Sequence, residues 1–179
     1  MTGPERRTNL ADVGKSGWKW EILGGALTMF RGTHRHSLDS KGRLNIPARF
    51  RDWLSAHCDG QLVVTIDVQN QENERCLVAY PLPHWETVEK AIAALPSTNA
   101  TARRFQRLFV GHSEELRLDS QSRILLSPNL RRFAGLEKDL VLVGQIHKFE
   151  IWDAARWDAC QESWLADADD FAALGDLVL

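Results

Sequence analysis

The residues best placed to do chemistry form the pentapeptide Asp39-Ser40-Lys41-Gly42-Arg43. An aspartate that opens a turn can accept hydrogen bonds from backbone N–H groups two residues further on, and Gly42 can adopt a positive φ where the turn needs one. Arg43 can reach back and pair with Asp39, which would hold the loop in shape. The same arginine can instead bind a guanine edge or a phosphate, while Lys41 offers a compact charge. The pentapeptide therefore predicts either a structural turn closed by an ion pair or a nucleic-acid-binding loop.

Cations gather around this pentapeptide although the whole chain of 179 residues is slightly acidic, with 22 Lys and Arg against 24 Asp and Glu. Residues 29–51 contain one acidic residue, Asp39, and six basic ones, which are Arg31, Arg35, Lys41, Arg43, Arg49 and Arg51. Residues 153–179 contain seven acidic residues and a single arginine. Charges act on a phosphate backbone only within a Debye length of about 8–10 Å, so the local excess is what counts. Nucleic acid therefore stays open as a partner. The acidic end is typical of a solvated tail, or it could shield the basic loop or bind a partner.

Three further patterns carry less weight. His34 and His36 are two residues apart on a predicted strand, as paired metal ligands can be. No further His or Asp at a suitable spacing follows them to complete a metal site. Ser40 is not predicted to be a catalytic nucleophile, because the sequence around it does not resemble a nucleophile elbow. One predicted helix carries Arg103, Arg104 and Arg107 on one side and apolar residues on the other. It could imitate a DNA-recognition helix, but such a basic face is more often solvated or packed against another subunit. The sequence thus predicts no metal, no cofactor, no catalytic residue and no enzyme.

The cysteines and the apolar segments bear on the compartment. Cys58, Cys76 and Cys160 lie far apart without a CxxC motif, which excludes a dense disulfide framework and a cysteine zinc site. No apolar run approaches the roughly 20 residues of a membrane-spanning helix, and the first residues lack a persuasive signal-peptide cleavage site. We therefore expect a cytoplasmic protein in a reducing compartment that does not enter a membrane.

The pentapeptide belongs to the first of two similar copies. Residues 38–46 align with 118–126, which matches Asp39 with Asp119 and Arg43 with Arg123. Residues 77–80 then match 149–152, and the change of offset falls at the polar run 69–75, which predicts a longer hairpin loop in the first copy. The second copy has Gln121 and Ser122 in place of the lysine and glycine, so we expect it to be retained for architecture.

Each copy predicts the same elements. Strands at 33–38 and 43–46, and at 114–118 and 123–126, flank the two turns. Pro47 and Pro128 suit the first turn of a short helix in each copy. Apolar strands follow at 62–66 and 76–80 in the first copy, and at 140–144 and 148–152 in the second. Ser127 and Asp153 are candidate N-caps, and helices at 83–95 and 100–110, the latter closed by Gly111, connect the copies. A unit of roughly 50 residues struggles to bury its sheet alone. The prediction is an α+β fold whose two β-rich halves share a barrel.

Several segments resemble the MraZ family. They are 29–32 (MFRG), the two D-x-x-x-R motifs, 81–85 (PLPHW), 103–112 (RRFQRLFVGH) and 142–152 (LVGQIHKFEIW). Members of this family are bacterial transcriptional regulators with two AbrB/SpoVT-type swapped-hairpin domains. The resemblance implies a first domain at 33–82, a helical connector at 83–111, a second domain at 112–156, and a C-terminal helix with an acidic tail at 157–179. Residues 1–28 form an extension outside the family pattern.

The resemblance also implies a function. Such proteins form a ring-shaped homo-oligomer that binds double-stranded DNA at tandem direct repeats upstream of the division and cell-wall gene cluster, and they usually repress their own operon. On this basis we expect Arg43 to contact DNA, with Arg31, Arg35 and Lys41 around it. Asp39, Gly42, Asp119 and Arg123 are expected to shape the loops. The protein would be nucleoid-associated, without a small-molecule ligand. The alternative is an oligomeric protein-interaction scaffold that does not bind specific DNA.

Overall fold

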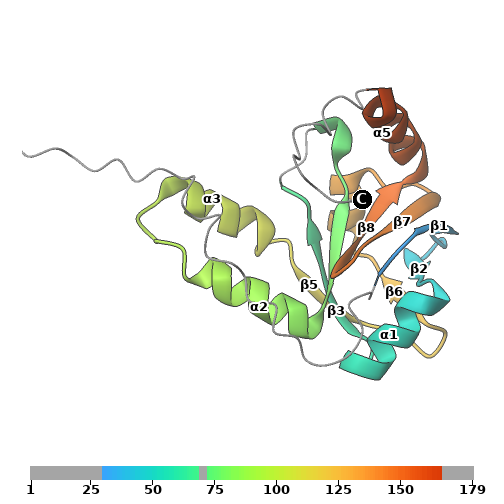
Figure 1. Ribbon diagram of the computed structural model, residues 1–179, viewed down its shortest axis with the longest axis horizontal. Helices are drawn as coiled ribbons and strands as arrows, with labels where there is room; N and C mark the ends of the chain where they lie inside the picture. Colours follow the sequence, from blue (N-terminus) through green and yellow to red (C-terminus); the bar gives the residue numbers. More distant parts are fainter. Residues whose placement is uncertain (1–29, 69–71, 167–179) are drawn as a thin grey trace, which may run out of the picture.

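The computed structural model describes residues 30–68 and 72–166, in which two antiparallel sheets are combined with five α-helices (Figure 1). The first copy contains β1 (Thr33–Ser37), β2 (Arg43–Asn45), α1 (Ala48–Cys58), β3 (Gln61–Ile66), the 3₁₀ helix η2 (Glu72–Glu74) and β4 (Leu77–Pro81). The connector contains α2 (Leu82–Ala93) and α3 (Ala100–Phe109). The second copy contains β5 (Glu114–Arg117), β6 (Arg123–Leu125), α4 (Pro128–Ala134), β7 (Asp139–Gln145), β8 (Lys148–Asp153) and α5 (Ala154–Ala166). The expected extension 1–28 and the acidic end from residue 167 lie outside the described residues.

The two copies exchange their first strands. The larger sheet has the order β1-β7-β8-β4-β3-β5, so the hairpins β3–β4 and β7–β8 meet in its middle through β4 and β8. Strand β1 pairs with β7 of the other copy, and β5 pairs with β3 of the other copy. Strands β2 and β6 pair with one another in a separate ribbon, with Leu44 opposite Ile124 at its centre. The mixed α+β class with two related halves is confirmed, and neither half has a complete sheet without the other.

The main core lies between one face of the larger sheet and the layer formed by α1, α4, β2 and β6. Side chains alternate along each strand, so Leu62 and Val64 on β3 point into this core with their neighbours on the other strands. Phe30, Phe50 and Phe149 meet at its centre with ring centroids 5.0–5.2 Å apart. This cluster joins Phe30, which lies three residues before β1, to helix α1 and strand β8, and thereby ties the two copies together.

The opposite face of the sheet carries two separate helical groups (Figure 1). Helix α5 covers Val141 and Trp152 through Trp157 and Trp164. Helices α2 and α3 instead cover β3 and β4, in a cluster that contains Val63, Tyr80, Trp85, Ile92 and Phe109. None of the helices in the described part of the chain is long and apolar enough to span a bilayer.

The predicted helix ends rest on local hydrogen bonds. Ser127 Oγ accepts a hydrogen bond from the backbone N–H of Leu130 at the start of α4, and Asp153 Oδ1 accepts one from Ala155 at the start of α5, so both expected N-caps are confirmed. Pro47 is the residue before α1 rather than within its first turn. Helix α3 ends as predicted beside Gly111, where an added Cβ would lie 2.1 Å from the carbonyl oxygen of Arg107.

Candidate nucleic-acid interface

The first Asp–Arg loop is closed around the carboxylate of Asp39. Its Oδ1 accepts hydrogen bonds from the backbone N–H groups of Lys41 and Arg43, both at 2.9 Å, and its Oδ2 accepts one from Arg43 Nε at 2.6 Å. The backbone N–H of Gly42 donates to Asp39 O at 2.9 Å. These donors, led by the Arg43 backbone N–H, hold the pKa of Asp39 below its usual value. The structural turn predicted from the pentapeptide is therefore present.

The second loop repeats this geometry around Asp119. Its Oδ1 accepts hydrogen bonds from the backbone N–H groups of Gln121 and Arg123 at 2.8 and 2.9 Å. Its Oδ2 accepts bonds from both Nε and Nη2 of Arg123, at 2.9 and 2.7 Å. The guanidinium of Arg123 is the main reason that the pKa of Asp119 falls to about 2. Ser122 adopts a positive φ of 61°, in the place where Gly42 has a φ of 81°.

The two loops are held at opposite ends of the β2–β6 ribbon. Gly42 O accepts a hydrogen bond from Leu126 N at 2.9 Å, and Ser122 O accepts the equivalent bond from Ile46 N at 3.1 Å. The ribbon is three residues long on each strand, which corresponds to about 10 Å. The fold thus presents two similar loops at the two ends of one short support, with Lys41 exposed in the first and Gln121 exposed in the second.

A further cation, which was not among the predicted site residues, joins the first loop. The guanidinium of Arg131 on α4 lies beside Gly42, 3.1 Å from the position that a Cβ would occupy there, and its Nε donates to Leu126 O. The signal was available in the repeat, because Arg131 matches Arg51. Arg51 pairs with its neighbour Asp52 at 3.4 Å instead. We call Lys41, Arg43 and Arg131 the loop-1 basic cluster.

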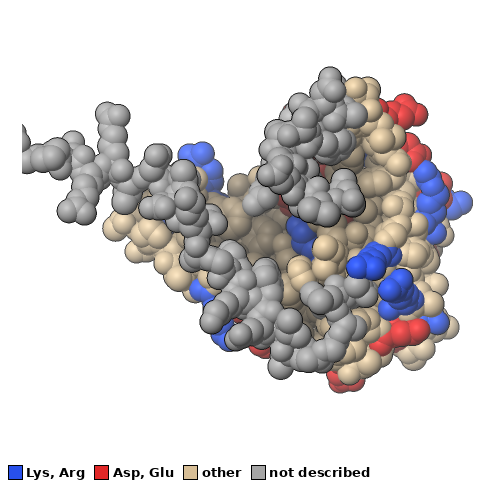
Figure 2. Space-filling view, in the orientation of Figure 1, with Lys and Arg blue, Asp and Glu red and all other residues tan. Residues whose placement is uncertain are grey.

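The structure separates Arg31 and Arg35 from this cluster. Arg31 is exposed just before β1, about 25 Å of extended chain from Asp39. Arg35 lies in the middle of β1, and its Nη2 donates to Asp158 Oδ1 on α5 at 2.5 Å. Figure 2 shows basic side chains over the region of β1 and β2, interspersed with acidic ones. The four predicted cations therefore form two groups rather than one contiguous patch around Arg43.

The two histidines of β1 have structural neighbours. His34 packs edge-on against Phe50 with ring centroids 5.0 Å apart, and one of its ring nitrogens lies 3.2 Å from Arg31 O. Burial, followed by the nearby His34, lowers the pKa of His36. Within the described ranges, the cluster of potential metal ligands lies elsewhere, at Asp67, Cys76 and Glu150. Both carboxylate oxygens of Glu150 accept hydrogen bonds there, from Trp152 Nε1 and Gln145 Nε2.

Helix α3 turns its apolar side inward and its arginines outward, as an amphipathic helix does. Phe109 is buried against Trp85, with ring centroids 5.6 Å apart, and Phe105 stacks on Phe109. The three arginines of α3 are exposed, and one of them, Arg103, donates to Ser97 O at 2.7 Å. The helix therefore belongs to the face of the sheet opposite the β2–β6 ribbon.

Comparisons with known proteins agree on a single family. The family model described as "MraZ protein, putative antitoxin-like" matches this chain twice, at residues 29–108 and 109–175. The protein "Transcriptional regulator MraZ" of Acidithiobacillus ferrooxidans is 81% identical over 151 residues, which are 84% of this chain and all of that protein. Proteins of the same name are 49% identical in Halorhodospira halophila, over 78% of this chain and 90% of theirs, and 52% identical in Nitrosomonas europaea, over 73% and 84%.

Proposed function

The chain belongs to the MraZ family, and on that premise we propose that it regulates transcription by binding double-stranded DNA through the loop-1 basic cluster. The matched relatives are named as transcriptional regulators, not as enzymes. In this proposal the protein is cytoplasmic and nucleoid-associated. It binds tandem direct repeats upstream of the division and cell-wall gene cluster, and by binding there it represses its own operon.

The observation that carries the proposal is the different use of the two loop arginines. Arg123 donates both Nε and Nη2 to Asp119, whereas Arg43 donates only Nε to Asp39. Within 30–68 and 72–166, no hydrogen bond uses the Nη groups of Arg43, and no ion pair includes Lys41. A guanidinium that is fixed by one edge and open at the other is preorganised for phosphate or for guanine O6 and N7. Arg43 is therefore our principal DNA-contact residue, while Asp39 positions it.

Oligomerisation supplies what a single loop lacks. A handful of cations binds DNA weakly and with steep salt dependence. A ring of subunits would repeat the cluster, and tandem repeats on DNA would let several subunits engage at once with a high effective concentration. The exchange of β1 and β5 between the halves supports a swapped-hairpin unit, in which one chain has the internal symmetry of a dimer. We propose a homo-oligomeric ring built from such units.

The test is binding to the protein's own upstream DNA at two salt concentrations, with light scattering to verify the oligomer. We expect Arg43→Gln to weaken binding about 10- to 100-fold, which corresponds to the loss of one good bidentate contact. Arg123→Gln is the matched control, because it removes the equivalent loop ion pair without removing an outward guanidinium edge. Undiminished binding by an intact Arg43→Gln oligomer would contradict the assignment. An oligomer that retains no specific DNA would favour the scaffold alternative.

A further inference from the structure

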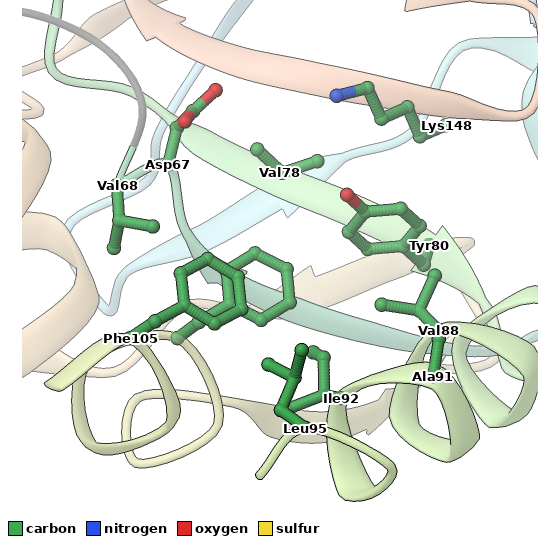
Figure 3. A pocket seen from close by; sticks show the side chains of 11 residues that line it. Asp67, Val68, Val78, Tyr80, Val88, Ala91, Ile92, Leu95, Phe105 and Lys148 are labelled. Atoms are coloured by element: carbon green, nitrogen blue, oxygen red, sulfur yellow. The ribbon is translucent and has the colours of Figure 1, made fainter. Parts of the chain in front are cut away.

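An open cavity of about 280 Å³ lies on the sheet face that carries the helices, between β4 and the α2–α3 pair. Figure 3 shows Val78 and Tyr80 of β4 on one side and residues of α2 and α3 on the other, all pointing into the same space. The apolar part of its lining includes Val68, Val78, Val88, Ile92, Leu95 and Phe105. We call this space the α2–α3 cavity. An open space with so many aliphatic and aromatic walls favours an apolar occupant.

The cavity has a basic group at its rim. Lys148 of β8 extends its ammonium over the ring of Tyr80, with Nζ 6.0 Å from the ring centroid (Figure 3). Among the described residues, no carboxylate lies within ion-pair distance of Lys148. Asp67 stands on the other side of the opening (Figure 3). Burial and the neighbouring Asp67 raise the pKa of Tyr80 to about 12, so its hydroxyl stays neutral. The lining thus suits an apolar segment that also carries an anion near Lys148.

The last turn of α5 contacts the connection between β3 and β4. Helix α5 ends at Ala166, and Trp164 in its last turn donates from Nε1 to Glu74 Oε1 at 3.0 Å. Glu74 belongs to the connection between β3 and β4, and that connection begins with the cavity residues Asp67 and Val68. The thirteen residues from 167 to 179 can reach up to about 43 Å when extended. The segment is therefore long enough to enter the cavity from its own chain.

The composition of this segment complements the cavity. It carries apolar side chains three residues apart, at Phe171, Leu174 and Leu177, and no Lys or Arg. Its acidic residues are Asp167, Asp169, Asp170 and Asp176. Burying one leucine or phenylalanine is favourable, and a carboxylate in contact with Lys148 would form an ion pair with it.

We propose that residues 167–179 dock in cis into the α2–α3 cavity, with Phe171, Leu174 and Leu177 against its apolar walls and an aspartate beside Lys148. The docked segment covers the sheet face between α5 and α2–α3. Its aspartates are then held on the face opposite the β2–β6 ribbon, where they do not compete with DNA for the loop-1 basic cluster. The docking itself does not depend on the proposed DNA binding.

Zero-length carbodiimide cross-linking of the full chain tests the docking directly, because it joins a lysine ammonium to a carboxylate only when the two are in contact. We expect an amide between Lys148 and an aspartate of 167–179, identified by mass spectrometry. Co-refolding of isotopically light and heavy chains distinguishes cis from trans. Cross-linked peptides of one isotopic kind support the proposal, whereas mixed pairs would assign the cavity to a neighbouring copy and overturn it. A segment that cross-links to Lys41 instead would also overturn it.

Hydrogen exchange provides the matched comparison between variants. We expect Leu174→Asp to accelerate exchange of the α2 and α3 amides about tenfold or more, because an aspartate cannot enter the apolar cavity. Leu165→Asp is the control, since Leu165 lies on α5 and is 67% exposed, and we expect no change in α2 or α3. Wild-type exchange in Leu174→Asp, or equal acceleration in both variants, would refute the docking.

Discussion

Gly42 is the position where the loop geometry makes its sharpest demand on residue type. Its φ of 81° lies in the left-handed region, and a Cβ there would stand 3.1 Å from the Arg131 guanidinium and from Leu126 O. The backbone cannot rotate away freely, because Gly42 O accepts the hydrogen bond from Leu126 N that links the two copies. The left-handed conformation costs an ordinary residue about 1–2 kcal/mol. We therefore predict that Gly42→Ser lowers the free energy of unfolding by about 1–2 kcal/mol.

The matched variant is Ser122→Gly, which makes the reverse exchange in the second loop. Ser122 already accepts a φ of 61°, so a glycine there relieves the conformational cost while adding entropy to the unfolded chain. We expect a change between zero and about 1 kcal/mol of stabilisation. The assay is urea unfolding of both variants at one fixed protein concentration, since oligomerisation links stability to concentration. The explanation is refuted if Gly42→Ser has the same free energy of unfolding as wild type. It is also refuted if Ser122→Gly has a lower free energy of unfolding than Gly42→Ser.

Three other variants test separate parts of the structure. The carboxylate of Asp119 stabilises the folded state above about pH 4, and this contribution is lost as the pH falls through about 2. We therefore expect the free energy of unfolding of Asp119→Asn to depend less on pH between those values. Urea titrations at several pH values measure this. Thr65→Val removes the hydroxyl that donates to Phe109 O at 2.5 Å in a fully buried site, and we expect a loss of about 1–3 kcal/mol in thermal unfolding. Asn99→Ala removes the N-cap of α3, where Asn99 Oδ1 accepts two backbone hydrogen bonds, and should cost about 1 kcal/mol together with faster hydrogen exchange in the first turn.

Local features were predictable from the sequence because their partners lie a few residues apart. Asp39 and Arg43 are four residues apart, and the ion pair between them forms as the first reading of the pentapeptide predicted. The caps at Ser127 and Asp153 follow the same logic, since a side-chain oxygen needs only the N–H groups of the next turn. The internal repeat then extends each local prediction to a second position, so the loop at Asp119 follows from the loop at Asp39.

Contacts between distant segments were not predictable in this way. Arg35 and Asp158 are 123 residues apart and meet because β1 lies on β7 beside α5. Arg131 reaches Gly42 because β2 and β6 share a ribbon. Both contacts depend on pairing between strands of different copies, and charge counts along the sequence carry no information about that pairing. For this reason residues 29–51 read as one basic segment, although the folded chain separates Arg35, which pairs with Asp158, from the loop that contains Lys41 and Arg43.

Differences between the side chains of the two loops explain how two copies of one motif can support different roles. In both loops, backbone N–H groups donate to the carboxylate of the aspartate, so the shape of the loop does not depend on Lys41 or Gln121. In the second loop, Arg123 uses two nitrogens to close the frame and Gln121 carries no charge. In the first, Arg43 closes the frame with one nitrogen, and Lys41 and Arg131 stand beside it. Replacing Lys41 with glutamine would give the first loop the residue that the second loop has at the equivalent position, Gln121. If the first loop is the DNA-contacting one, Lys41→Gln lowers the salt slope of DNA binding by about 0.9 for each engaged subunit, while the reverse change Gln121→Lys leaves the specific site unaltered.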